Sequence, residues 1–297
     1  MTWQQFPNTW LCSLNDVKLR NSSSAGNYGG DENEYDDDQL STFIEQASSD
    51  IIRNIQSLPI PHNATALFDW SSDYVDYYSK ILNVYRDTDI LAISSITNGD
   101  GTSVGSSNYV LKPNNSYPKY QVALKESSAV RWRPASNGNY EQVISIVGTF
   151  GNVPHYQHCW KDTGVTLGAA IADATTTSIT VSSASGYSKG NYIQIDSETL
   201  FIEGVDTDTN ILTVVRGVLG TTAAAHGNTT AVLTYVFKND LKLAAVEWAQ
   251  YLYVTKDKVG EDIVTFNGGV TAPRGLSPMV INTVTRNIKR HLDGMLN

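Results

Sequence analysis

The stretch VVRGVLGTTAAAH, residues 214–226, closes a unit that begins at residue 186 and decides how the middle of the chain folds. Three short apolar runs lie in this unit, at residues 192–195, 200–202 and 212–215, and Asp, Asn, Gly and Ser separate them. Short apolar runs broken by turn-forming residues are typical of β-strands joined by tight turns. Residues 186–226 therefore predict a small all-β unit.

The composition describes a globular protein. Of the 297 residues 41% are hydrophobic and 17% are charged, which is enough apolar material for a sizeable core. The formal net charge is −9. A protein that grips nucleic acid through its phosphates needs a basic face, so DNA binding is not expected as the main task.

The two cysteines, Cys12 and Cys159, match no metal or disulfide framework and are consistent with a reducing compartment. The N-terminal residues lack the basic start and apolar core of a signal peptide. No run approaches the eighteen or so apolar residues of a membrane span. We therefore expect synthesis in a cytoplasm and no association with a membrane.

Three segments show helical periodicity: residues 37–58, 240–258 and 277–293. We expect Asp37 or Asp38 to cap the first helix, Asp240 the second, and the pair Ser277 and Pro278 to begin the third. The apolar stripe of the first helix consists of Leu40, Phe43, Ile44, Ala47, Ile51 and Ile55.

Residues 68–149 read mostly as strands. Residues 90–96, a polar loop at 97–102 and residues 109–111 predict a hairpin, and residues 120–124 and 142–147 predict two further strands.

The order of these segments is similar to a known family. The motif RGVLGTTAAAH resembles a small β module that recurs in structural proteins of tailed bacteriophages. The segments WLCSLNDV (10–17), DDDQL (36–40), SITNGDGT (95–102), VGTFG (147–151) and DLKLAAV (240–246), with the last helix after Pro278, together resemble head–tail connector proteins of tailed phages, also called adaptor or head-completion proteins.

The resemblance implies an α+β fold with a helical connector core, a β-hairpin or sheet region and an inserted small all-β domain. The connector domain would comprise residues 1–163 and 237–297, and the inserted module residues 164–236. It further implies a structural virion protein, assembled in the host cytoplasm, that forms a ring of twelve copies between the portal and the tail. Such a ring joins the head to the tail and lets DNA pass without tight binding. Two alternatives stay open: another tail component, such as a tail-terminator or baseplate-proximal protein, and a glycan-binding tail protein.

Three groups of residues contain side chains that could bind a metal or act in catalysis. His155, His158 and Cys159 lie close in sequence, but a structural zinc site needs a second ligand pair. The acidic run at residues 31–38 lacks the closing Glu of a calcium loop and is expected to favour a helix N-terminus instead.

Asp100, Asp196 and Glu198 lie at expected turns, with no indication of two carboxylates converging across a cleft. The sequence therefore predicts no catalytic, cofactor or metal site, and no enzymatic activity. The residues expected to bind a partner are Arg286, Lys289 and Arg290, a cationic cluster on the last helix that would dock onto the portal or a neighbouring copy.

Overall fold

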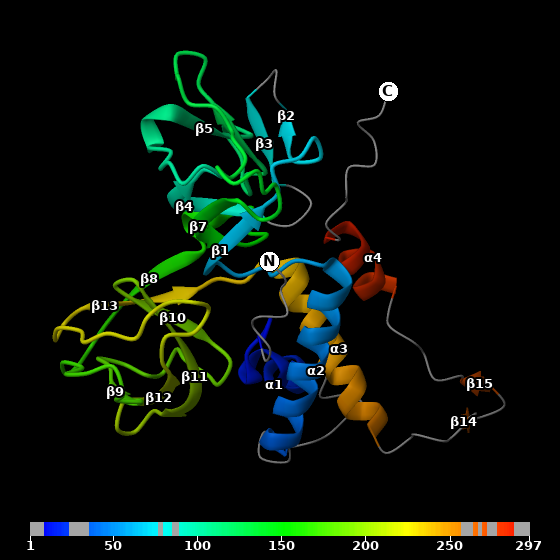
Figure 1. Ribbon diagram of the computed structural model, residues 1–297. Coiled ribbons are helices and arrows are strands. Elements are labelled where there is room, and N and C mark those ends of the chain that lie inside the picture. The colour runs from blue at the N-terminus through cyan, green and yellow to red at the C-terminus, as the bar shows by residue number, and fades with distance from the viewer. Residues whose placement is uncertain are drawn as a thin grey trace.

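The computed structural model describes residues 9–23, 36–76, 80–84, 89–256, 264–266, 269–271 and 278–287. Four α-helices lie within these residues: α1 (Leu14–Ser23), α2 (Asp37–Ile55), α3 (Asn239–Thr255) and α4 (Pro278–Asn287). Helices α2 and α3 pack together, α1 contacts both, and α4 packs on α2 and α3. Two helices from each end of the described chain thus form one helical layer (Figure 1).

The helix starts follow capping rules, although not at the residues expected. Ser13 and Asp16 cap α1 reciprocally, because each backbone amide donates to the other side chain, at 3.0 and 3.2 Å. The expectation that Asp37 or Asp38 caps α2 is wrong: the Asp36 carboxylate accepts from the amides of residues 38 and 39.

The expected cap of the next helix is also wrong. Lys238 occupies the N-cap position of α3 with no side-chain cap, and Asp240 lies in the first turn. Pro278 begins α4, whereas Ser277 and residues 288–293 of the expected helix lie outside the described residues.

The first β region contains two antiparallel sheets. One has the order β1-β7-β4 and the other the order β2-β3-β6-β5. The strands are β1 (His62–Phe68), β2 (Val75–Asp76), β3 (Ile81–Asn83), β4 (Ile90–Thr97), β5 (Tyr109–Lys112), β6 (Gln121–Leu124) and β7 (Ile144–Phe150). The two further strands expected near 120–124 and 142–147 are confirmed as β6 and β7.

The hairpin expected from residues 90–111 is wrong. β4 pairs with β7 and β5 pairs with β6, and the polar loop is closed locally by an isolated bridge between Thr97 and Ser103 and by the Val104 amide, which donates to the Ile96 carbonyl. Turn-forming residues between two strands do not determine which strands pair. Pairing depends on which apolar faces are buried together. Apolar side chains from both sheets pack together in a single hydrophobic core that the helices do not share.

A six-stranded antiparallel sheet follows, with the order β8-β13-β10-β11-β12-β9. Its strands are β8 (Trp160–Thr166), β9 (Ser178–Thr180), β10 (Tyr192–Ile195), β11 (Glu198–Asp206), β12 (Ile211–Val215) and β13 (Ala231–Tyr235). The predicted succession of three strands over residues 192–215 is confirmed as β10, β11 and β12. This sheet, called the β module below, encloses a separate apolar core. The division of the chain into residues 164–236 and the rest stays a prediction about independent folding.

The expected fold class is wrong, because the chain is mostly β rather than built on a helical connector core. Helices account for 24% and strands for 32%, and about 13 strands form three antiparallel sheets. A separate two-stranded hairpin consists of β14 (Val264–Phe266) and β15 (Gly269–Thr271). The physical reason is that the described chain between residues 62 and 235 contains thirteen strands and no α-helix. They bury two of the three hydrophobic cores without the helices.

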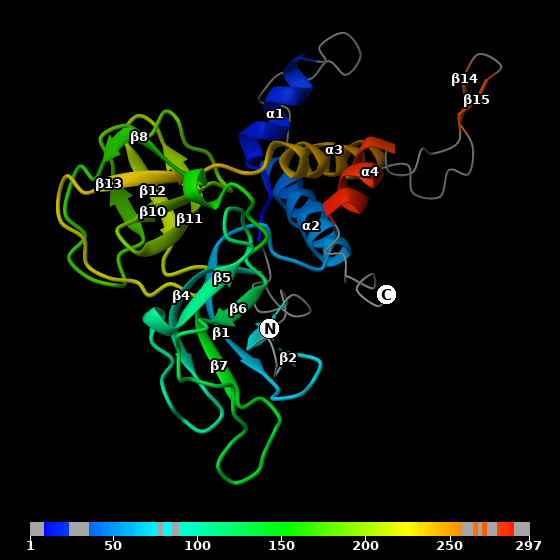
Figure 2. The same cartoon turned by 90° about the horizontal axis from the view of Figure 1, so that it is seen from above.

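Figures 1 and 2 show how these parts lie around the helical layer. The β module lies beside α1 and α2, and α4 lies on the opposite side of the layer. Two surfaces of the helical layer are therefore directed away from each other, one toward the β module and one carrying α4.

Candidate functional site

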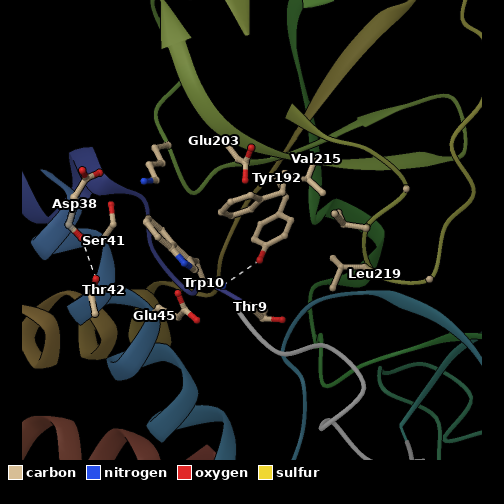
Figure 3. A pocket seen from close by; sticks show the side chains of 15 residues that line it. Thr9, Trp10, Asp38, Ser41, Thr42, Glu45, Tyr192, Glu203, Val215 and Leu219 are labelled. Atoms are coloured by element: carbon tan, nitrogen blue, oxygen red, sulfur yellow. Dashed lines mark hydrogen bonds between the residues drawn. The ribbon is translucent and has the colours of Figure 1, made fainter. Parts of the chain in front are cut away.

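A cleft of about 680 Å³ lies between α2 and the β module (Figure 3). Its aromatic wall consists of Trp10, Tyr192 and Phe201. The Phe201 ring centroid lies 5.7 Å from that of Trp10 and 5.2 Å from that of Tyr192, in edge-on and tilted geometries that aromatic rings favour. We call this space the acidic cleft, for the carboxylates described below.

The N-terminal segment positions this wall by joining α2 to the β module. The Trp10 amide donates to the Tyr192 hydroxyl at 3.0 Å, and the Leu11 amide donates to Ser48 Oγ on α2 at 3.0 Å. Gly190 lies directly against the Trp10 ring with a φ of +97°, and a Cβ there would be 2.5 Å from a ring carbon. A residue with a side chain at this position would be strained and would displace Trp10.

Three carboxylates line the cleft: Asp38 and Glu45 on α2, and Glu203 on β11. None of them forms an ion pair with a described residue. Among the described lining residues, Lys189 is the single cationic one, and its Nζ lies 5.8 Å from the Trp10 ring centroid. Three negative charges against one positive charge leave the cleft with a formal charge of −2.

Ser41 adds an unsatisfied polar group to the same cleft. Its residue is 7% exposed, and its Oγ has no hydrogen-bond partner in the described part of the chain. A buried hydroxyl without a partner costs free energy, so a ligand that supplied a donor there would recover it. The cleft therefore offers negative charge, aromatic faces and a free acceptor to one occupant.

A second charged cluster lies inside the β module, around Glu198. Its carboxylate accepts from Arg216 Nε and Nη2, both at 2.7 Å, and from the amides of Gly217 and Ala224 at 2.9 and 3.0 Å. His226 Nε2 lies 2.8 Å from the same carboxylate, and His226 Nδ1 lies 2.8 Å from Asp196 Oδ2. The side chains of Glu198, Arg216 and His226 are 0, 5 and 2% exposed.

This cluster explains the role of the Arg, Gly, Ala and His residues in the motif at residues 214–226. Burial by itself would raise the pKa of Glu198, but the bonds from Arg216 and His226, with those from two backbone amides, outweigh it and lower the pKa to about 2. The carboxylate is therefore ionised and holds both ends of the loop, from Arg216 to His226. Because the side chains of Glu198, Arg216 and His226 are almost fully buried, the cluster acts as a structural lock on this loop.

The glycines of the motif serve backbone geometry. Gly217 and Gly220 have φ values of +62° and +73°, in the left-handed region. A Cβ at Gly220 would lie 2.0 Å from the Asn63 carbonyl oxygen, and the Asn63 amide donates to the Leu219 carbonyl at 2.8 Å. The loop thereby connects the β module to β1.

The three carboxylates considered for catalysis lie in two different regions of the structure. Asp196 and Glu198 both contact His226, Glu198 from inside the module and Asp196 from the surface, where its side chain is 61% exposed. Asp100 lies elsewhere, where its carboxylate accepts from Thr102 and lies 3.8 Å from Arg133 Nη1.

His155, His158 and Cys159 do not converge. His155 Nε2 lies 2.8 Å from the Val236 carbonyl oxygen, and Cys159 Sγ donates to the Tyr156 carbonyl. Among the described residues, no group of three or more His, Cys, Asp or Glu side chains is arranged to hold a metal ion. Residues 31–35 of the acidic run lie outside the described residues.

Of the three cationic residues expected to bind a partner, Arg286 is described. It is exposed on α4, and its Nε donates to the Asn282 carbonyl of the same helix at 3.2 Å. Lys289 and Arg290 lie outside the described residues. Sequence reasoning did not find the acidic cleft, because its residues come from segments far apart in the chain. The acidic residues close to position 38 were the one available signal.

Comparisons with known proteins found no relative: no protein-family model, no curated protein and no solved structure matches this chain. Within the described ranges, no helix has the length and apolar character needed to cross a bilayer.

Proposed function

We propose that this chain is a structural protein of a tailed-phage virion, in the neck between head and tail. In this proposal copies form a ring, expected to be a dodecamer, beneath the portal protein. The ring contacts the tail or its terminator protein on the other side. It continues the DNA channel without gripping the duplex, and it performs no catalysis.

One observation carries the proposal. Four of the segments that resemble connector proteins, at residues 10–17, 36–40, 240–246 and after Pro278, are dispersed along the chain, yet they contribute to one hydrophobic core. This core contains Trp10, Leu14, Ile44, Val153, Leu241, Ala245 and Val280, and thus members of the opening segment, α2, the chain after β7, α3 and α4. The segments at residues 95–102 and 147–151 belong to a separate core. A chance likeness of short motifs gives no reason for four of them to meet in one core.

The placement of the β module gives further support. It lies on one side of the helical layer and is hydrogen-bonded to the N-terminal segment. The side of the helical layer away from the module therefore stays exposed and can contact neighbouring copies. Exposed apolar residues remain on α3 and α4, among them Leu243, Val254 and Ile281. Apolar side chains on a rim of charged and polar residues are typical of protein–protein contact surfaces.

The test is an assembly experiment with particles that lack this chain. DNA-filled heads and complete tails are expected to accumulate separately, and adding the purified chain is expected to join them. Heads and tails that join normally without the chain would contradict the proposal. Normal particles that fail to adsorb to cells would instead indicate a glycan-binding tail protein.

A further inference from the structure

The acidic cleft has the chemistry of a site for a cationic side chain. Aromatic faces attract cations, and carboxylates pair with them, most effectively in a partly desolvated recess. A guanidinium group suits this mixture best, because it is planar, weakly hydrated and carries five donors. One donor would also satisfy Ser41 Oγ, which lacks a partner among the described residues.

A candidate for this side chain is present on the opposite side of the helical layer. Arg286 is exposed on α4 and forms no ion pair with a described carboxylate. Ile281, five residues earlier on the same helix, is 50% exposed and adds an apolar side chain to the exposed surface of α4. Arginine is enriched among the residues that contribute most to binding at protein–protein interfaces and that fill pockets of the partner.

We propose that the acidic cleft of one copy receives Arg286 from α4 of a neighbouring copy. The two surfaces differ: the cleft lies between α2 and the β module, whereas α4 lies on the side of the helical layer away from the module (Figures 1 and 2). A contact between two different surfaces is heterologous, and its repetition closes into a ring when the rotation between copies permits. This inference rests on the proposed function, and it names the contact by which the ring forms.

The test uses charge reversal in the full-length chain, followed by sedimentation velocity over a range of protein concentrations. We expect the wild-type chain to self-associate. Glu45→Lys and Arg286→Glu are each expected to weaken self-association at least about tenfold, because each places like charges in contact. The double variant carries the pair in swapped order and is expected to recover most of the lost association.

Matched controls reverse exposed charges elsewhere: Glu141→Lys in the loop before β7, and Lys161→Glu on β8. Both are expected to associate like the wild type, and unchanged thermal unfolding shows that each variant folds. The inference is overturned if the wild type stays monomeric, if the single reversals associate normally, or if the double variant recovers nothing.

The two proposals fail differently. Association that ignores these charges overturns the arginine contact, while the purified chain would still join heads to tails. Failure of the chain to join heads and tails overturns the neck function, whatever the sedimentation result.

Discussion

Replacing Glu198 by Gln is expected to open the loop at residues 214–226 more than any change on the module surface. The carboxylate accepts from five donors, and the two from Arg216 are charge-assisted. Gln keeps one acceptor oxygen, turns an amide NH₂ toward these donors and leaves the Arg216 charge buried without a counter-charge. Breaking a buried ion pair in this way costs about 3–5 kcal/mol.

Hydrogen exchange at the amides of Gly217 and Ala224 measures this cost directly, because both amides donate to Glu198. At about 1.4 kcal/mol per tenfold, the expected cost corresponds to exchange more than about a hundredfold faster. Asp208→Asn, at an exposed turn of the same module, is the control and is expected to change stability by no more than about 0.5 kcal/mol. A cost below about 1 kcal/mol for Glu198→Gln would refute the lock.

Four further outcomes are expected. Because the pKa of Glu198 is lowered from 4.5 to about 2, its contribution to stability is complete above pH 4.5 and is lost as the pH falls toward 2; the difference in unfolding free energy between wild type and Glu198→Gln should shrink over that range, and a constant difference would contradict this. Gly220→Ala should destabilise by about 2 kcal/mol or more in thermal unfolding, because strain and a backbone clash add, whereas Gly138→Ala, with positive φ and open space, should show the strain alone. Burial raises the pKa of the Cys12 thiol, and that of Cys159 to about 12, so neither should react with a thiol reagent until the chain unfolds, and reaction in the native state would show that the cysteines are accessible. Duplex DNA should show no submicromolar, salt-sensitive affinity in an anisotropy titration, since the net charge is −9; such affinity would indicate a DNA-gripping role.

Local patterns predicted much of the secondary structure. The apolar stripe of α2 and the three runs of the β module are periodic over several residues, so their element types follow from the sequence. Helix α1 was not predicted, because it is short and its start depends on the reciprocal capping by Ser13 and Asp16. The pairing of β4 with β7 joins strands about fifty residues apart, which no local pattern specifies.

The balance of the fold and the candidate site were beyond such patterns. Counting the strongly periodic segments overestimates the helical fraction of the chain, because short strands with irregular burial have weaker sequence patterns. The acidic cleft is formed by Trp10, Glu45 and Glu203, which come from three separate segments of the chain. In the sequence Glu198 is indistinguishable from a turn carboxylate, and only the structure shows that His226 and Arg216 surround it. These arrangements arise from tertiary packing, which the sequence does not display.

The central claim is that this chain forms the neck of a virion, and the most direct test is to locate it in the particle. A cryo-electron microscopy reconstruction of the purified particle, extended through the junction of head and tail, should show this fold as a ring directly beneath the portal. Density for the chain at the tail tip or along the tail, or its absence from the particle, would contradict the account.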